Sequence, residues 1–294
     1  MTAQIALDGM PTRLFSCTPA RLNAWQDCPR RYRLQYVDRV SVVSRPWAHL
    51  SLGSSVHSAL AAWWQLPADR RTVTAAGALV VRKWSADGFR DAAQSDEWQT
   101  RAREMVESYL AGVDPLDEPV GVERTVAVKT GALAVSGRVD RIDLRDGEAV
   151  VVDYKTGRHV LTTDDARGSL ALALYAAATA RTLRRHCRRV ELHHLPTGQI
   201  VVWEHTEESL ARQLRRAEDI AEEVLGAEEA YRAGGDAETL FPARVSALCS
   251  FCDHAAACPA AAGVRPRDAW DALPDLTAEA AAASGGPERG ELAG

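Results

Sequence analysis

The residues best suited to chemistry gather in one stretch, Gly137–Gly157, which reads GRVDRIDLRDGEAVVVDYKTG. Its Asp146-Gly147 pair stands between two apolar-rich runs, and such a pair predicts a β-hairpin because both turn positions favour positive φ. In that hairpin Asp140 falls opposite Asp153, and Lys155 lies on the same strand face as Asp153. Two facing carboxylates repel each other unless a cation lies between them. The stretch therefore predicts a divalent metal site, with a surface hairpin of scattered charges as the alternative.

A second set of suited residues is three cysteines near the C-terminus, in Cys249-Ser250-Phe251-Cys252 and Cys258-Pro259. A tetrahedral thiolate site needs a fourth ligand, and Cys28 is followed by proline just as Cys258 is. Four thiolates could hold zinc or a cubane iron–sulfur cluster, and the spacing alone does not separate the two. A Cys-x-x-Cys redox pair is a third interpretation, but it leaves Cys258 unexplained. Cys17 and Cys187 are then spare thiols.

Composition and charge bound the class of protein. The chain has 294 residues, 46% of them hydrophobic and 26% charged, and its formal net charge is −5 at pH 7. These values are typical of a soluble globular protein, and no run approaches the ~20 apolar residues of a membrane span. The N-terminus lacks the pattern of a signal peptide, so we expect a cytoplasmic protein without structural disulfides. The net charge excludes a generally basic nucleic-acid coat but allows a local basic groove.

The elements that position these residues can also be predicted. Thr18-Pro19 begins a helix that Cys28-Pro29 interrupts. A later helix carries Gly53 and His57 on one face, where a lone histidine is more often a core residue than a ligand. Amphipathic helices over 65–112 precede three successive strands that carry Glu123, Asp140 and Asp153. The last part is predicted to contain an apolar helix over 169–183, a hairpin of 190–195 with 199–203, and a long helix over 207–232.

Several short motifs follow one another in a specific order along the chain. They are Thr18-Pro-Ala-Arg-Leu-Asn with Cys28-Pro-Arg-Arg-Tyr32, Gly53-x-x-x-His57, Gly137-Arg-Val-Asp140-Arg-Ile-Asp143, Asp153-Tyr-Lys155-Thr-Gly157 and Cys249-x-x-Cys252-x5-Cys258. This set resembles the RecB-like branch of the PD-(D/E)XK nuclease superfamily, in its iron–sulfur form. Relatives of that kind include the nuclease domain of AddB and the CRISPR-associated accessory nucleases. Each motif is weak alone, but their shared order is specific.

The resemblance implies roles for individual residues. His57, Asp140 and Asp153 would bind Mg²⁺ or Mn²⁺, with Glu123 as a further possible ligand, and Lys155 would activate or orient the attacking water. The four cysteines, Cys28, Cys249, Cys252 and Cys258, would hold a structural [4Fe–4S] cluster, with zinc as the second choice. Arg138 and Tyr175 would position DNA. The family often has glutamine four residues before this tyrosine, whereas this chain has Ala171.

The implied fold is α/β, with a restriction-endonuclease-like core. A central mixed sheet is flanked by helices, and a four-cysteine cluster joins the N- and C-terminal segments. We expect a flexible segment over 1–17, one nuclease domain over 18–267, and a disordered tail over 268–294. The implied function is a metal-dependent DNA exonuclease that acts on single-stranded or end-containing DNA in repair or recombination. The alternative is a catalytically weak nucleic-acid-binding subunit of a larger assembly. The sequence contains no phosphate-loop motif, so a helicase partner would have to be a separate chain.

Overall fold

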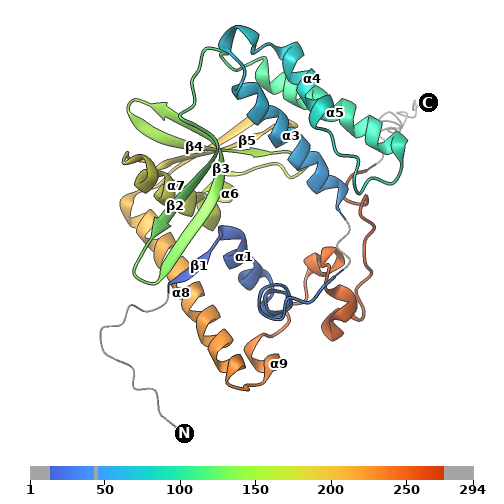
Figure 1. The fold of residues 1–294 in the computed structure, drawn as a ribbon, viewed down its shortest axis with the longest axis vertical. Coiled ribbons are helices and arrows are strands. Elements are labelled where there is room, and N and C mark those ends of the chain that lie inside the picture. Colours follow the sequence, from blue (N-terminus) through green and yellow to red (C-terminus); the bar gives the residue numbers. More distant parts are fainter. Residues whose placement is uncertain (1–13, 43–45, 275–294) are drawn as a thin grey trace, which may run out of the picture.

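A mixed β-sheet lies at the centre of the computed structural model, which describes residues 14–42 and 46–274 (Figure 1). In this part of the chain the sheet has six strands in the order β1-β3-β4-β5-β6, and β2 also pairs with β3. The β1–β3 and β4–β5 pairs are parallel and the other pairs are antiparallel. The strands are β1 Phe15–Cys17, β2 Gly121–Lys129, β3 Leu133–Arg145, β4 Glu148–Lys155, β5 Arg189–His194 and β6 Gln199–Glu204. The predicted α/β class with a mixed sheet is confirmed.

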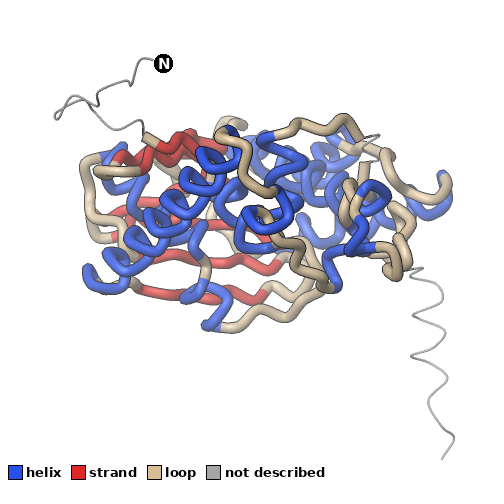
Figure 2. The backbone as a smooth tube through the Cα atoms, turned by 90° about the horizontal axis from the view of Figure 1, so that it is seen from below, coloured by secondary structure: helices blue, strands red, loops and turns tan. Residues whose placement is uncertain are grey.

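Helices cover both faces of the sheet. On one face α3 (Ala48–Trp64), α4 (Val73–Lys83) and α5 (Ala92–Leu110) bury Val150 and Val152 of β4. On the other face α7 (Leu170–Leu183) packs on β2, β3 and β4. The strands occupy one half of the molecule, and the other half contains only helices and loops (Figure 2). The remaining helices are α1 Pro19–Asp27, α2 Pro29–Tyr32, α6 Thr163–Gly168, α8 Glu207–Arg232 and α9 Ala237–Leu240.

The ends of these elements follow from local sequence. Thr18 caps α1 by accepting a hydrogen bond from the backbone N–H of Arg21, and Pro19 begins the helix. Cys28 is extended, with φ −164°, and separates α1 from α2, as a residue before proline should. Asp146 (φ 53°) and Gly147 (φ 84°) form the turn between β3 and β4. The predicted hairpin and helix boundaries around these residues are confirmed.

One edge of β3 is divided between two partners. β2 pairs with β3 from Ala134 to Ile142, so β1 and β4 must both lie on the opposite edge. On that edge β1 pairs with Leu133–Val135, and β4 pairs only from Arg141 onward. Among the described residues, positions 136–140 therefore have no strand partner on this edge. The sheet forks here, and the fork contains Asp140.

Both ends of the described chain are more ordered than the sequence indicated. Phe15–Cys17 fell in the predicted flexible segment, yet it forms a strand parallel to Leu133–Val135. At the other end, Leu273 is buried, and its carbonyl oxygen accepts a hydrogen bond from the side chain of Gln94, 3.1 Å away. Tertiary contacts of this kind leave no local sequence signal. Residues 1–13 and 275–294, the rest of the two predicted segments, lie outside the described residues.

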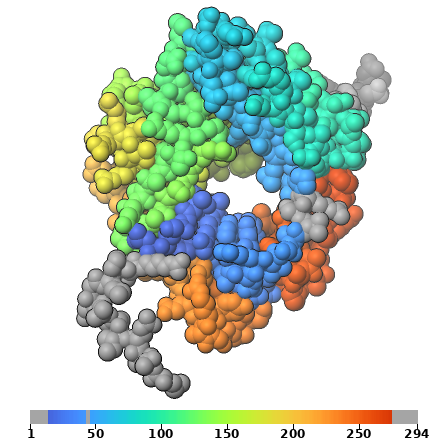
Figure 3. Space-filling view, viewed as in Figure 1, coloured from blue at the N-terminus to red at the C-terminus, as the bar shows by residue number. Residues whose placement is uncertain are grey.

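An opening passes through the molecule (Figure 3). It is bordered by β2 and β3, by α3, and by α1. Two contacts between the start of α3 and the C-terminal turns close the rim of this opening. The rings of Trp47 and Phe251 lie 5.3 Å apart, and the backbone N–H of Ala48 donates a hydrogen bond to the carbonyl oxygen of Ala269. In the described ranges, no helix is long and apolar enough to cross a membrane.

Candidate active site

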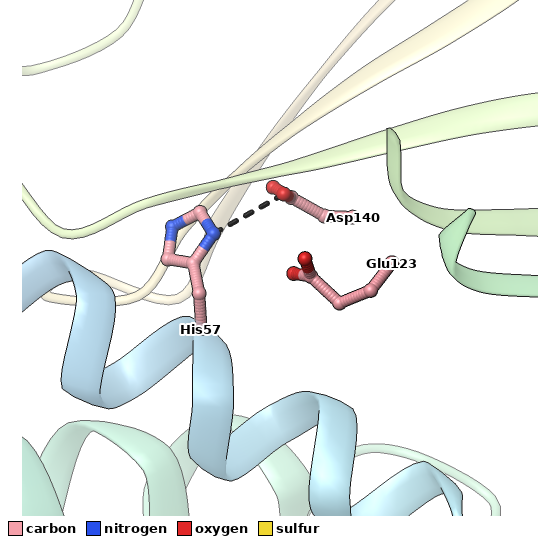
Figure 4. Close-up of side chains that lie close together, drawn as sticks. All are labelled: His57, Glu123 and Asp140. Atoms are coloured by element: carbon pink, nitrogen blue, oxygen red, sulfur yellow. Dashed lines mark ion pairs between the residues drawn. The ribbon is translucent and has the colours of Figure 1, made fainter. Parts of the chain in front are cut away.

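Three potential metal ligands from three different elements meet at the fork in the sheet (Figure 4). His57 comes from α3, Glu123 from β2 and Asp140 from β3. One ligand atom from each lies within 4.8 Å of the others, and Nδ1 of His57 is 3.2 Å from Oδ1 of Asp140. All three side chains are partly buried. His57, whose role the helix pattern alone left open, therefore belongs to the candidate metal site. Glu123 belongs to it as well, together with Asp140.

The carboxylate that faces Asp140 belongs to Glu123, which corrects the predicted pairing with Asp153. The β2–β3 pairs on either side are Val122 with Arg141 and Arg124 with Val139, so Glu123 stands opposite Asp140. The β3–β4 ladder ends one position before Asp140. The strands separate there because β4 continues along β5. Oδ2 of Asp140 instead accepts a hydrogen bond of 2.9 Å from the backbone N–H of Tyr154.

The backbone at this facing pair is irregular. Glu123 has φ 49°, a left-handed conformation that costs a residue with a side chain about 1–3 kcal/mol. In a regular strand Val139 and Arg141 would share a face. Instead, Val139 packs in the core beneath α7, whereas the Arg141 guanidinium lies over the ring of Trp64, 5.1 Å from its centroid. The strand reverses its faces at Asp140, and this turns the Asp140 carboxylate into the fork.

Asp153 and Lys155 form a close pair at the end of β4. Nζ of Lys155 is 2.6 Å from Oδ2 of Asp153, which confirms that the two side chains share a strand face. Burial raises the pKa of Asp153, the Lys155 ammonium opposes this effect, and the charge of Asp140 adds to it. Asp153 is thus within electrostatic reach of Asp140, although it is not one of the three ligands that converge. Its carboxylate lies beside the site, with a neutralising lysine.

The charges of the site favour a bound cation. Burial alone would lower the pKa of His57, but the hydrogen bond and the negative charge of Asp140 outweigh burial and raise it. Burial and the charge of Asp140 also raise the pKa of Glu123, against the nearby Arg138. Without a metal the site therefore tends to hold protons. A set of carboxylate oxygens with one imidazole nitrogen suits Mg²⁺ or Mn²⁺, so these residues fit the divalent ion that the motif resemblance implies.

The two residues predicted to position DNA flank the same site. Arg138 is 71% exposed, and its Nε lies 2.6 Å from Oε2 of Glu123. Tyr175, on α7, lies against β3 so closely that a Cβ atom on Gly137 would be 2.4 Å from its Cε1 atom. Only glycine allows this approach of ring to strand. Both residues line the cleft that contains His57 and Asp140.

This cleft coincides with the opening through the molecule. Its walls include Thr18–Ala20 of α1 and the length of α3 from His49 to Gln65, which face each other across the opening. Four basic side chains also line it, namely Lys83, Arg138, Lys155 and Arg158. Cations next to metal-binding carboxylates are suited to a phosphate-containing ligand.

The four predicted cysteine ligands line one cavity, but in the described part of the chain their sulfurs do not converge as a cluster. Cys28, Cys249, Cys252 and Cys258 all line one cavity between α1–α2 and the C-terminal turns. The backbone N–H groups of Arg244 and Ser246 point at the sulfurs of Cys28 and Cys249, at 3.4 Å and 3.5 Å. Within the described residues, no three cysteine sulfurs lie within 4.8 Å of one another. Cys17 and Cys187 are buried in other parts of the core.

A buried polar network beneath the site was missed in the sequence. Nη1 of Arg141 lies 3.2 Å from the hydroxyl oxygens of both Tyr109 and Tyr154. Tyr109 also hydrogen-bonds His193, which contacts Glu191 at 3.0 Å. Burial raises the pKa of Glu191, but the hydrogen bonds from His193 and Arg145 outweigh it and hold the pKa well below its usual range. Charged residues within a strand that is buried on both faces, as in RVELHH, were the available signal.

Fold and site together define a member of a nuclease superfamily. The family model of the PD-(D/E)XK nuclease superfamily matches residues 16–259, a span that contains every site residue described above, and the chain belongs to this superfamily. The Gene 69 protein of Mycobacterium phage D29 is 23% identical over 278 residues, covering 82% of this chain and 95% of that protein. A candidate exonuclease from Eubacterium rectale has a solved structure with TM-score 0.45 and 11% identity, covering 78% of this chain and 88% of that one.

Proposed function

We propose that this protein is a metal-dependent DNA exonuclease of the RecB-like, iron–sulfur branch of the superfamily, which degrades single-stranded DNA from an end during repair or recombination. The observation that carries the proposal is that His57, Glu123 and Asp140, together with Lys155, line an opening that passes through the molecule. A closed opening admits a nucleic-acid strand only by its end. End-dependent cleavage then follows from shape, without any contact that recognises a terminus.

The chemistry assigns a distinct task to each side chain. His57, Glu123, Asp140 and Asp153 would hold Mg²⁺ or Mn²⁺, and when bound this ion supplies the polarisation of the scissile phosphate and of a water. The Lys155 ammonium, close to Asp153, orients the attacking water and offsets negative charge that develops on the phosphate. The hydrogen bond from the Tyr154 backbone fixes the orientation of the Asp140 carboxylate.

The four-cysteine cavity is proposed to hold an iron–sulfur cluster that fastens the rim of the opening. The proposal is supported by the four cysteines that line one cavity, and a zinc ion on the same thiolates is the second choice. Cys28 lies at the end of α1, and Cys249 and Cys252 flank Phe251, which contacts Trp47. A metal group here would therefore hold closed the contacts that complete the rim.

The test compares linear and circular single-stranded DNA of the same sequence, with Mg²⁺, Mn²⁺ or EDTA. We expect metal-dependent release of nucleotides from linear DNA and cleavage of the circle at least 100-fold slower. Asp153→Ala and Lys155→Ala should each abolish cleavage while their circular dichroism spectra match the wild type. Asp164→Ala, which removes an exposed carboxylate on α6, is the matched control and should retain full activity. Equal rates of cleavage of linear and circular DNA would disprove the end-dependent mechanism. Absence of cleavage with both Mg²⁺ and Mn²⁺ would disprove the proposed nuclease activity.

A further inference from the structure

A second groove lies next to the cleft and is not used by the proposed chemistry. Its lining comes from β1, α1, β2, β3 and α7, and Thr18 lines both the groove and the cleft. We infer that this groove binds the sugar–phosphate backbone of the single strand on one side of the cleavage point. The inference rests on the proposed function, because it extends the path of the same substrate.

Small side chains form part of the lining of the groove. Ser16 pairs with Ala134 across β1 and β3, and Ala127 pairs with Ser136 across β2 and β3. These four residues line the groove and occupy adjacent positions on three neighbouring strands. These side chains alternate with Cys17 and Val135, which pack in the core with α1 and α7, so they lie on the opposite, open face of the strands. A strand face of small residues leaves room for a chain to lie along it.

The walls of the groove are basic. Lys129 from the end of β2 and Arg181 from α7 are both exposed, and no carboxylate of the described residues forms an ion pair with either. Arg21 stands on the α1 side, but it is already held by Glu228 at 3.1 Å and by the Tyr32 hydroxyl. Two unpaired cations from different elements are therefore available for phosphate groups.

An aromatic ring completes the wall on the α1 side. Tyr36 lines the groove and is only partly buried, and its ring lies 5.1 Å from that of Tyr32. The Arg21 guanidinium is 5.2 Å from the ring centroid of Tyr36 and fixes its orientation. Basic walls with an aromatic ring are the combination that binds single strands without sequence preference.

The groove lies at a defined distance from the chemistry. Ser136 and Asp140 are four residues apart on β3, which corresponds to about 13 Å at ~3.3 Å per residue. A stacked strand advances about 3.4 Å per nucleotide, so about four nucleotides span this distance. Oligonucleotides shorter than this cannot reach the groove from the cleavage point, whereas longer ones can.

The double variant Lys129→Gln/Arg181→Gln tests the groove. Binding of a labelled 20-nucleotide strand is measured by fluorescence anisotropy in EDTA over a range of salt concentrations. The loss of two phosphate contacts should weaken binding about tenfold and reduce the slope of log K against log salt by about 1.4. In the presence of metal, cleavage of the 20-nucleotide strand should slow severalfold, while cleavage of a trinucleotide should be unchanged. Arg184→Gln/Arg185→Gln, the same change of charge just beyond α7, is the matched control and should behave as wild type.

The outcomes separate the groove from the proposed function. Unchanged affinity and salt slope in Lys129→Gln/Arg181→Gln, or equal losses in the control variant, would overturn the groove assignment even if the protein is a fully active nuclease. Weakened binding in the groove variant alone would support the groove, even if the wild-type protein failed to cleave DNA and the proposed nuclease activity were wrong.

Discussion

Substitution of Gly137 by alanine should disturb both the stability and the cleft of the protein. The added Cβ would lie 2.4 Å from Cε1 of Tyr175, closer than carbon atoms approach in proteins, and 3.2 Å from its Cζ, which is a tight contact. Overpacking of this kind costs about 1–3 kcal/mol, and the smaller entropy of an unfolded chain with alanine offsets about 0.7 kcal/mol of it. We therefore expect a net loss of about 1.3 kcal/mol in the free energy of unfolding. For a domain of this size that lowers Tm by about 2 °C.

The assay combines urea denaturation with single-stranded DNA cleavage. Because the Tyr175 ring must move in the cleft wall, cleavage should slow by about tenfold. Gly131→Ala is the matched control, since nothing lies within 4 Å of its added Cβ, and it should change neither property. In the double variant Gly137→Ala/Tyr175→Ala the clash is absent, so the two substitutions should couple by at least about 1 kcal/mol. Additive effects of the two substitutions, or a Gly137→Ala protein as stable as wild type, would refute the reasoning.

Three further predictions concern the network, the metal and the cysteines. Glu191→Gln should lower the free energy of unfolding by about 2 kcal/mol at pH 7, because it removes the charge that Arg145 and His193 contact. The pKa of Glu191 is lower in the folded protein than in the unfolded chain, so the wild type should be the more stable of the two above about pH 4.3. This difference in the free energy of unfolding should shrink as the pH falls below that value. Equal differences at pH 7 and pH 3 in urea titrations would contradict the prediction. Saturating Mn²⁺ at about 100 times Kd should stabilise the wild type by about 2.7 kcal/mol and Asp140→Asn by much less, and equal thermal shifts would show that Asp140 is not a ligand. Cys28→Ser should lose iron and sulfide after anaerobic purification whereas Cys17→Ser retains both, and the reverse result would reassign the fourth cysteine.

Where local chemistry decides the conformation, the sequence was a sufficient guide. Asp146-Gly147 forms the turn because few other pairs adopt two positive φ angles, and this turn determines the register of β3 and β4 as far as Arg141. The cap at Thr18 and the break at Cys28 depend equally on adjacent residues. The ordered motifs brought His57 into the same set as Asp140, and the structure places their side chains in contact.

The parts that could not be predicted depend on contacts between distant segments. Nothing near Glu123 in the sequence indicates a left-handed residue, because that conformation is imposed by the change of face at Asp140 on the neighbouring strand. The parallel pairing of β1 with β3 joins segments that are separated in the sequence by helices α1 to α5 and by strand β2. The hydrogen bond from Gln94 to Leu273 likewise has no local pattern. These features depend on contacts that exist only once the sheet has assembled, so no local sequence pattern predicts them.

The contacts that close the opening have a consequence for the order in which a new chain matures. They join early residues to late ones, Trp47 to Phe251 and Ala48 to Ala269. Ribosomes add roughly 5–20 residues per second, so roughly 10–40 s pass between the appearance of Trp47 and that of its partner. Before the end of this interval β2, β3 and β4 have left the ribosome and can form their hairpins. A nascent chain thus has its carboxylates in place while the rim is still open, and the enclosing shape is the last property that it acquires.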